Sequence, residues 1–315
     1  ALSLEFLNGN GEDEAKARVV RAAGEQRELP ESIADTVFEL RNDPSPVVRL
    51  QVAIAAAKQE SISTIPTLVD VLAQAGEDPL VPRIVWQNLH PLLETQTAEF
   101  VTAINRLKSP KPASVIDLLP RAADRILSTP KPDTRAVAAL VTLLLESKST
   151  EDTADRCLQL LTTRIRSGEI TGDGLVDIRT QLQTSLLLTA KQQIDRPLTV
   201  SAIELATSLK LVDAIPAANT IFLNSDNADV RLRMVNALVT AGAANALTLA
   251  EAILATSEST DVRRKAIQTI GRIGNKAAAE ILLHQMPRLP ADVQPAVIES
   301  LTDREESAIA LLELV

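Results

Sequence analysis

The chain is very poor in aromatic side chains, with no tyrosine, one tryptophan and four phenylalanines among 315 residues. A β-sandwich or β-barrel needs many aromatic and β-branched strand residues between glycine turns. Sites that stack rings on nucleic acid bases or sugars need exposed aromatic side chains as well. The composition therefore argues against an all-β fold and against ring-stacking ligand sites.

A sustained basic stripe is missing too. The chain carries 32 basic and 41 acidic residues, a net charge of −9, and one of its densest basic spots is the short run Arg263–Lys265. A groove that follows a phosphate backbone needs continuous positive charge. We therefore expect no nucleic-acid partner and interpret this run as a solvated helix start.

The residues that usually carry catalysis or bind metals are scarce. Cys157 is the single cysteine and cannot form an internal disulfide. It lies among apolar residues, as a small core residue would. His90 and His284 are far apart and outside any metal-ligand spacing. Gly274 belongs to a segment that resembles a helix C-cap and not a dinucleotide loop. We expect no enzyme activity, no cofactor and no metal site.

Long hydrophobic runs are also missing, because no apolar stretch reaches the length that crosses a bilayer. We expect no membrane insertion. The chain begins at Ala1 without a methionine, in a stretch that already has helical character. We therefore interpret the sequence as a piece of a larger protein, and its single cysteine does not decide the compartment.

A recurring phrase is the most informative feature that is present. An acidic turn leads into a helix that opens with an apolar residue and an arginine. The phrase occurs at Asp43–Arg49, Asp78–Arg83, Asp226–Arg231 and Thr260–Arg263. Self-similarity at a fixed spacing predicts a repeat architecture, which works through extended surfaces.

The spacing of the phrase identifies the kind of repeat. Arg83 follows Arg49 by 34 residues, and Arg263 follows Arg231 by 32 residues. Arg18 precedes Arg49 by 31 residues. A period in the low thirties is too long for a coiled-coil heptad and suits a pair of short antiparallel helices.

Apolar residues recur at helical spacing through most of the chain, as in Ile65, Leu68, Val69 and Leu72. We expect about eighteen helices in an all-α fold, an α-α superhelix of about nine antiparallel helix pairs. The prediction is a single solenoid over residues 1–315. Its regular repeats span 12–95 and 224–315, and its degenerate repeats span 96–223.

Sequence punctuation supports these boundaries. Ser109-Pro110 and Thr129-Pro130 place a capping hydroxyl before a proline, which indicates turns between helices. The segments 224–226 and 257–261 contain Asn, Ser, Thr and Asp residues suited to N-caps just before two of the periodic helices.

The pattern Asp-x-x-Val-Arg before an Ala- and Leu-rich helix resembles the second helix of a HEAT repeat, and the likeness extends over most of the chain. In that family the acidic residue and the arginine of successive repeats form a hydrogen-bonded ladder. The resemblance implies an architectural role for four pairs, which are Asp43 with Arg49, Asp78 with Arg83, Asp229 with Arg231, and Asp261 with Arg263. An aspartate at a helix N-terminus also complements the helix dipole.

A narrower likeness covers residues 78–89. This segment resembles one in large exported proteins of planctomycetes and their relatives, which combine a dehydrogenase-like propeller, HEAT repeats and a c-type haem domain. The resemblance implies that this chain is the helical middle of such a protein, exported or periplasmic. The chain has no Cys-x-x-Cys-His motif, so haem attachment is not transferred to it.

Trp86 stands out because it is bulky and solitary at a helix start. We expect it to fill the core between repeats, and an exposed contact on the concave face is the alternative. Together with His90 it forms the candidate interaction surface of the sequence.

These observations favour a non-catalytic interaction scaffold whose curved helical surface binds a partner protein or flanking domains of the same polypeptide. One alternative is a helical-repeat enzyme of the bilin lyase-like or base-excision-like kind. Another is a structural spacer between redox domains, which would lack a binding face.

Overall fold

The computed structural model describes residues 13–59, 61–147, 150–194, 196–256 and 259–302. Seventeen α-helices and four 3-10 helices lie in these ranges, and no strand does. The α-helices are α2 Asp13–Gly24, α3 Glu31–Glu39, α4 Pro46–Ala56, α5 Thr64–Ala73, α6 Leu80–Leu89, α7 Thr97–Arg106, α8 Ala113–Leu127, α9 Thr134–Glu146, α10 Glu151–Arg166, α11 Gly172–Thr189, α12 Pro197–Ser208, α13 Ile215–Asn224, α14 Ala228–Ala241, α15 Ala246–Ala255, α16 Thr260–Ile273, α17 Lys276–Gln285 and α18 Gln294–Thr302. The 3-10 helices are η1 Leu40–Asn42, η2 Leu92–Glu94, η3 Val212–Ala214 and η4 Met286–Arg288.

Contacts divide the chain into two compact units. Unit 1 contains the described residues up to Cys157 together with Val176–Gln181, and unit 2 contains Leu158–Leu175 and the described residues from Leu182 onward. The division runs through α10 and α11, in the stretch where the recurring phrase is lost. The single solenoid over residues 1–315 stays a prediction.

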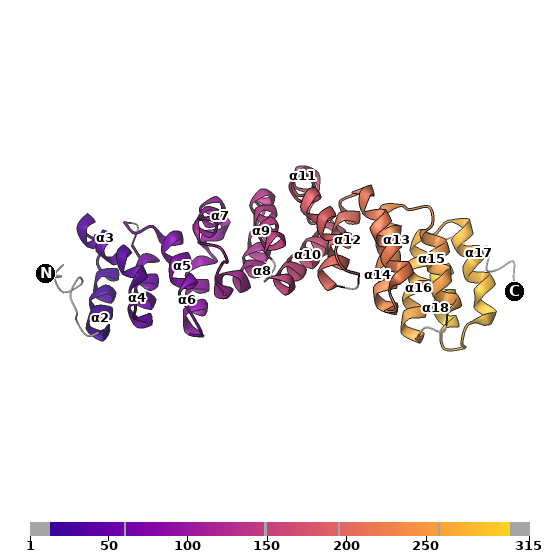
Figure 1. The fold of residues 1–315 in the computed structure, drawn as a ribbon, viewed down its shortest axis with the longest axis horizontal. Coiled ribbons are helices and arrows are strands. Elements are labelled where there is room, and N and C mark those ends of the chain that lie inside the picture. Colours follow the sequence, from indigo (N-terminus) through magenta and orange to yellow (C-terminus); the bar gives the residue numbers. More distant parts are fainter. Residues whose placement is uncertain (1–12, 60, 148–149, 195, 257–258, 303–315) are drawn as a thin grey trace. The chain divides into compact units, whose positions relative to one another are not determined.

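Each unit has two layers of helices (Figure 1). In unit 1, α4 packs between α2 and α6 in one layer, while α5 packs against α7 in the other. In unit 2, α14 packs between α12 and α16, and α16 packs against α18, while α15 and α17 lie in the second layer. Successive helices therefore alternate between an even-numbered and an odd-numbered layer. The predicted fold class, an all-α superhelix of stacked helix pairs, is confirmed.

The core of unit 1 follows the apolar spacing of its helices. The predicted face of α5, with Ile65, Leu68, Val69 and Leu72, is completely buried. At the contact between α2 and α4, a Cβ added to Gly24 would lie 3.0 Å from the Cα of Ala55. These two backbones therefore touch through small residues, as the Ala-rich composition predicts.

The core of unit 2 extends from α12 to α18. Helix α12 is buried on nearly all sides, and Glu204 is its one charged residue. The neighbouring helices have the expected ends. The side chain of Ser259 accepts a hydrogen bond from the Val262 amide at the start of α16, and Gly274 ends that helix in the left-handed conformation, with φ of 60°. The predicted C-cap at Gly274 is confirmed. Asn227 caps α14, one residue after the predicted segment.

The prolines give a mixed result. Pro110 and Pro130 lie between helices, as the sequence predicts. Pro120 lies inside α8, where local rules predict a break.

Within the described ranges, the helices are too short or too polar to span a bilayer.

Candidate functional site

The first predicted ladder pair, Asp43 and Arg49, is buried where η1 leads into α4. One Nη atom of Arg49 donates to the main-chain oxygen of Asp43 at 2.7 Å, and the other donates at 2.9 Å to the main-chain oxygen of Gln74, directly after α5. The Asp43 carboxylate accepts a hydrogen bond from the Ser45 amide at 2.9 Å and pairs with Lys16 of α2 at 3.6 Å. The two residues join three helices, but the guanidinium binds main-chain oxygens and not the Asp43 carboxylate.

The second pair keeps only half of this arrangement. The Asp78 carboxylate accepts from the Leu80 amide at 2.8 Å, which repeats the turn at Asp43. Arg83 is exposed and has no hydrogen-bond or ion-pair partner within the described ranges. The acidic turn is therefore retained, and the arginine contact is not.

In unit 2 the two aspartates of the phrase meet at one lysine. Lys265 of α16 lies 2.6 Å from the Asp261 carboxylate and 3.9 Å from the Asp229 carboxylate of α14. The hydrogen bond and the charge of Asp261 raise the pKa of Lys265. The acidic positions of successive repeats are linked here through a lysine that the sequence analysis assigned only to a solvated helix start.

The arginines of unit 2 have other contacts. The guanidinium of Arg263 donates to the main-chain oxygen of Thr256 at 2.9 Å, directly after α15. The Arg231 guanidinium lies 5.5 Å from the centroid of the Phe222 ring. Carbonyl groups at helix C-termini have no intrahelical partners and carry partial negative charge. Arg49 and Arg263 satisfy such groups, and a side-chain ladder of the four pairs stays a prediction.

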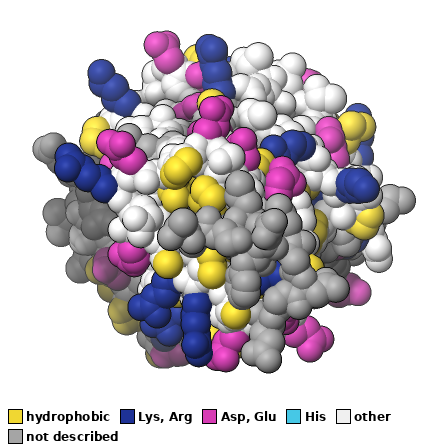
Figure 2. Space-filling view, turned by 90° about the vertical axis from the view of Figure 1, so that its left-hand side faces the viewer, with side chains coloured by type: hydrophobic (Ala, Val, Ile, Leu, Met, Phe, Trp, Pro, Cys, Tyr) yellow, Lys and Arg dark blue, Asp and Glu magenta, His cyan; other side chains and the backbone are white. Residues whose placement is uncertain are grey.

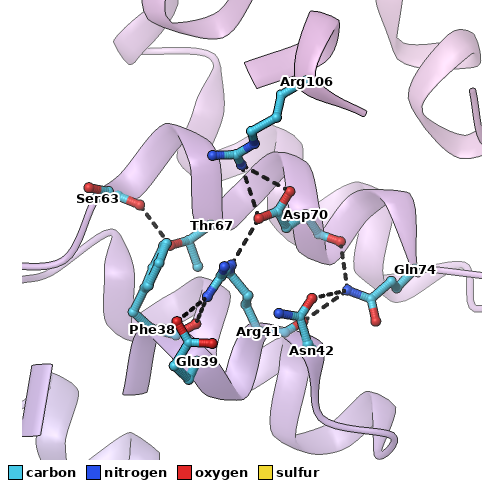
Figure 3. Close-up of polar contacts among 9 residues, drawn as sticks. All are labelled: Phe38, Glu39, Arg41, Asn42, Ser63, Thr67, Asp70, Gln74 and Arg106. Atoms are coloured by element: carbon cyan, nitrogen blue, oxygen red, sulfur yellow. Dashed lines mark hydrogen bonds and ion pairs between the residues drawn. The ribbon is translucent and has the colours of Figure 1, made fainter. Parts of the chain in front are cut away.

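A carboxylate–arginine ladder does exist in unit 1, in the odd-numbered layer (Figure 3). Asp70 of α5 accepts a hydrogen bond from Arg41 of η1 at 2.9 Å and from Arg106 of α7 at 3.1 Å. The guanidinium of Arg41 also lies 3.6 Å above the centroid of the Phe38 ring. One carboxylate thus connects three successive elements of this layer.

Gln74 extends this ladder at the end of α5. Its side-chain amide donates to the main-chain oxygen of Arg41 and to the Asn42 side chain, both at 3.1 Å. Sequence reasoning missed these residues because it searched for partners inside the recurring phrase. A usable signal was present, since Asp70 follows Arg41 by 29 residues and precedes Arg106 by 36 residues, about one repeat in each direction.

The structure gathers aromatic and charged side chains around Trp86 in the even-numbered layer of unit 1. Trp86 is half-buried, so it is neither a fully buried core plug nor a freely exposed ring. The guanidinium of Arg121 from α8 lies 4.3 Å from the Trp86 ring centroid. The His90 ring stacks on the Trp86 ring, with 5.6 Å between the two ring centroids. We call Trp86, His90 and Arg121 the Trp86 surface.

Backbone contacts hold this surface in place. Arg125 of α8 donates to the main-chain oxygen of His90 at 3.3 Å and forms an ion pair with Glu94 of η2. The His90 Nδ1 atom lies 3.2 Å from the main-chain oxygen of Trp86. The candidate interaction residues Trp86 and His90 are therefore brought together, and two arginines that the sequence analysis did not link to them come from α8.

Unit 2 contains a group of arginines around one carboxylate. Glu204 of α12 accepts hydrogen bonds from Arg233 of α14 at 2.6 and 3.2 Å, and its side chain is 12% exposed. Arg166, at the end of α10, donates to the Ser208 hydroxyl at 3.2 Å. Partial burial lowers the pKa of Arg166, the Glu204 carboxylate opposes this, and the positive charges of Arg272 and Arg233 lower it further. We call Arg166, Glu204, Arg233 and Arg272 the arginine cluster.

An open groove of about 530 Å³ is lined by residues of α14, α16 and α18. The three helices are neighbours in one layer (Figure 1). Arg272 lines the groove, and its charge acts on Arg166 of the arginine cluster. It also donates a hydrogen bond to the side-chain oxygen of Asn236. Asn236 also accepts a hydrogen bond from the Thr269 hydroxyl at 2.8 Å. The groove is lined by Leu232, Asn236, Lys265, Gln268, Thr269, Gly271, Arg272 and Ser300.

Charges of both signs lie side by side on the face drawn in Figure 2, which looks at the chain from the N-terminal side.

Cys157 is buried, as predicted, and burial raises the pKa of its thiol to about 12. A thiol that stays protonated at neutral pH is a poor nucleophile. His284 is exposed on α17. In the part of the chain that the structure describes, no three His, Cys, Asp or Glu residues gather as metal ligands.

Comparison with family models identifies one region of the chain. Residues 216–302 match a model of HEAT repeats. The match covers most of α13 and all of α14–α18, which include the helices of the groove. A comparison with curated proteins finds no match.

Among solved structures, the chain is similar to a chain in a homology model of the full-length AP-3 complex in an intermediate open conformation. The identity is 16% and the TM-score is 0.45. The similarity covers 94% of this chain and 56% of that chain, so this chain spans little more than half of the other's length.

Proposed function

We propose that the chain is a non-catalytic scaffold that binds a partner protein, or flanking domains of the same polypeptide, through the surface of its stacked helices. The Trp86 surface carries this proposal. It presents the single tryptophan of the chain, half-buried, in contact with an arginine and a histidine. Tryptophan and arginine are enriched among the residues that dominate binding energy at protein interfaces.

Pre-ordering of this surface supports the same function. The Arg125 contacts with His90 and Glu94 hold α6, η2 and α8 in register around Trp86. A binding surface that is ordered before the partner arrives loses less conformational entropy on association. The observed stacking of Trp86 on His90 therefore favours binding over mere exposure.

The experiment that tests this function is affinity capture with the tagged chain from the cells that produce it, with quantitative comparison of variants. Trp86→Ala should remove the captured partner. Arg83→Ala is the matched control, because Arg83 is exposed on the same helix and has no partner within the described ranges. Because Trp86 is only half-buried, we expect its truncation to lower the free energy of unfolding by about 2 kcal/mol, less than for a fully buried tryptophan.

Two results would decide against the scaffold. Identical capture by the native chain, Trp86→Ala and Arg83→Ala would show that the partner does not bind through the Trp86 surface, whereas a native chain that captures nothing is expected of a structural spacer. Loss of capture in both variants would show that the effect does not depend on this surface. The exported or periplasmic location and the place between redox domains rest on the sequence resemblance alone and stay predictions.

A further inference from the structure

We propose that the Trp86 surface binds a carboxylate side chain of the partner protein, and that Arg121 is the residue that contacts this carboxylate. This site rests on the proposed scaffold function and adds the chemistry of the partner segment. Within the described part of unit 1, an arginine lies over an aromatic ring at two places. A carboxylate of the chain itself binds the arginine at only one of them.

The first of these places is complete within the chain (Figure 3). The Arg41 guanidinium lies 3.6 Å from the centroid of the Phe38 ring. Its Nε atom donates to the Asp70 carboxylate at 2.9 Å, and one Nη atom donates to the main-chain oxygen of Phe38 at 2.8 Å. The ring therefore positions the guanidinium, and oxygen atoms accept hydrogen bonds from its N–H groups.

The second place has the ring and the guanidinium without the carboxylate. Arg121 is exposed, and its guanidinium lies 4.3 Å from the centroid of the Trp86 ring. It has neither a hydrogen bond nor an ion pair among the described residues, although Asp117 and Asp124 lie one turn away on the same helix. A guanidinium over a ring interacts through its charge, which leaves its five N–H donors for oxygen ligands. A carboxylate of a partner would complete this place as Asp70 completes the first.

Neighbouring contacts fix the ring that positions Arg121. The His90 ring stacks on the Trp86 ring, with 27° between the two planes. The main-chain oxygen of Trp86 can only accept, so the His90 Nδ1 atom at 3.2 Å is the donor. Glu94, the carboxylate of η2 beside this surface, is already engaged in an ion pair with Arg125. The surface is thus ordered before a ligand arrives, which lowers the entropy lost on binding.

The groups of this surface match a carboxylate that lies next to an apolar side chain. Arginine binds carboxylates through two parallel hydrogen bonds, and the half-buried ring of Trp86 offers apolar area beside it. The net charge of −9 opposes a polyanion such as a nucleic acid. A single carboxylate in an otherwise uncharged segment meets much less of this repulsion. A protein segment is therefore favoured over a nucleic acid.

Fluorescence of Trp86 tests the site directly, because Trp86 is the single tryptophan and the chain has no tyrosine. The probe is the peptide Ser-Leu-Glu-Leu-Ser, blocked at both ends and titrated to millimolar concentration, and Ser-Leu-Gln-Leu-Ser is its uncharged counterpart. We expect the glutamate peptide to change the emission and to bind about tenfold more tightly than the glutamine peptide. Equal affinities for the two peptides would overturn the inference, and so would an unchanged emission with both.

Variants of single arginines locate the contact. Arg121→Gln should abolish the preference for the glutamate peptide, because a neutral amide cannot replace the charged fork. Arg121→Lys keeps the charge without the planar fork, so we expect an affinity about threefold below that of the native chain. Arg83→Gln is the matched control, since it removes the same charge from an exposed position one turn before Trp86. Equal affinities of Arg121→Gln and Arg83→Gln for the glutamate peptide would contradict the assignment.

Two further measurements complete the test. Circular dichroism of each variant establishes that it is folded, as expected for substitutions at exposed positions. Displacement of the glutamate peptide by oligouridylate at equal concentration would overturn the assignment to a protein carboxylate and indicate a nucleic-acid site.

Failure of the carboxylate site and failure of the scaffold function give different results. Capture that depends on Trp86 but not on Arg121, without a preference for the glutamate peptide, would leave the scaffold standing and remove the carboxylate site. Binding of the glutamate peptide that depends on Arg121, without any Trp86-dependent capture, would have the opposite meaning.

Discussion

The Asp70 ladder of unit 1 and the arginine cluster of unit 2 use the same chemistry with different charge balance. In the ladder, Asp70 holds Arg41 and Arg106, and Arg41 also lies 3.3 Å from the Glu39 carboxylate. Carboxylates and guanidinium groups are equal in number there. In the cluster, Glu204 pairs with Arg233, and the charges of Glu204, Arg272 and Arg233 all act on Arg166.

Burial separates the contacts that hold the fold from those that contribute little. Asp70 and Arg41 are each 15% exposed, so removing one of them leaves a buried charge behind. Arg106 and Glu39 are 52% and 71% exposed, and exposed ion pairs contribute little to stability. The comparison therefore teaches that an ion pair between repeats must be interpreted with the burial of its partners.

The largest expected effect tests the ladder. Asp70→Ala should lower the free energy of unfolding by about 3 kcal/mol, because Arg41 is left mostly buried without its main carboxylate. Urea denaturation followed by circular dichroism measures this loss. Asp35→Ala, at an exposed position of α3, is the control and should change stability by less than about 0.5 kcal/mol. Equal stabilities of the two variants would show that the ladder is not architectural.

The next prediction tests the cluster. Glu204→Gln keeps the size of the side chain but removes the carboxylate that faces the arginines, so we expect a loss of about 2 kcal/mol. Urea denaturation followed by circular dichroism measures this loss. A stability equal to that of the native chain would contradict an architectural role for the contact between Glu204 and Arg233.

A smaller effect is expected when one arginine is removed from each network. Arg106→Gln should lower the free energy of unfolding by about 0.5–1 kcal/mol, since its contact with Asp70 is partly exposed to solvent. Arg272→Gln should change it by less than about 0.5 kcal/mol, because glutamine can still bond to Asn236 and the mutual repulsion with Arg166 is removed. Thermal and urea unfolding of both variants measure the contrast, and a larger loss in Arg272→Gln would reverse it.

The smallest effect concerns pH. The hydrogen bond and the charge of Lys58 lower the pKa of the Glu25 carboxyl from its ordinary value of 4.5. A lowered pKa in the folded state contributes stability above the unfolded-state pKa, and this contribution is lost as pH falls through the folded value. The difference in urea midpoint between the native chain and Glu25→Gln should therefore be constant near neutral pH and shrink below pH 4.5. A difference that grows on acidification would contradict the assignment.

Local patterns predicted the architecture well. The period in the low thirties predicted stacked helix pairs, and the buried face of α5 matches the apolar spacing at Ile65, Leu68, Val69 and Leu72. Both depend on residues close together in sequence. Pro120 is the exception, because the local rule predicts a break there. Leu119 and Ala122 are fully buried beside it, so packing of α8 compensates for the lost backbone hydrogen bond.

The sites were predicted less completely. Trp86 was identified because it is bulky and solitary, and His90 because it lies on the same helix, but the contacts of both depend on α8, which supplies Arg121 and Arg125. The role of Glu204 could not be inferred from its own helix. It depends on side chains of the neighbouring repeats, whose distance from α12 is set by how the helices pack.

By itself the sequence determined the repeat length, the helical class and the buried face of α5, because helix formation and amphipathic spacing are local properties of the chain. The tertiary structure alone decided that Asp70 bridges Arg41 and Arg106, and that Glu204 pairs with Arg233. Such partners lie about one repeat apart or farther, and a small rotation of one helix against the next exchanges one charged neighbour for another. Long-range charge contacts are therefore a property of the packing of the stack.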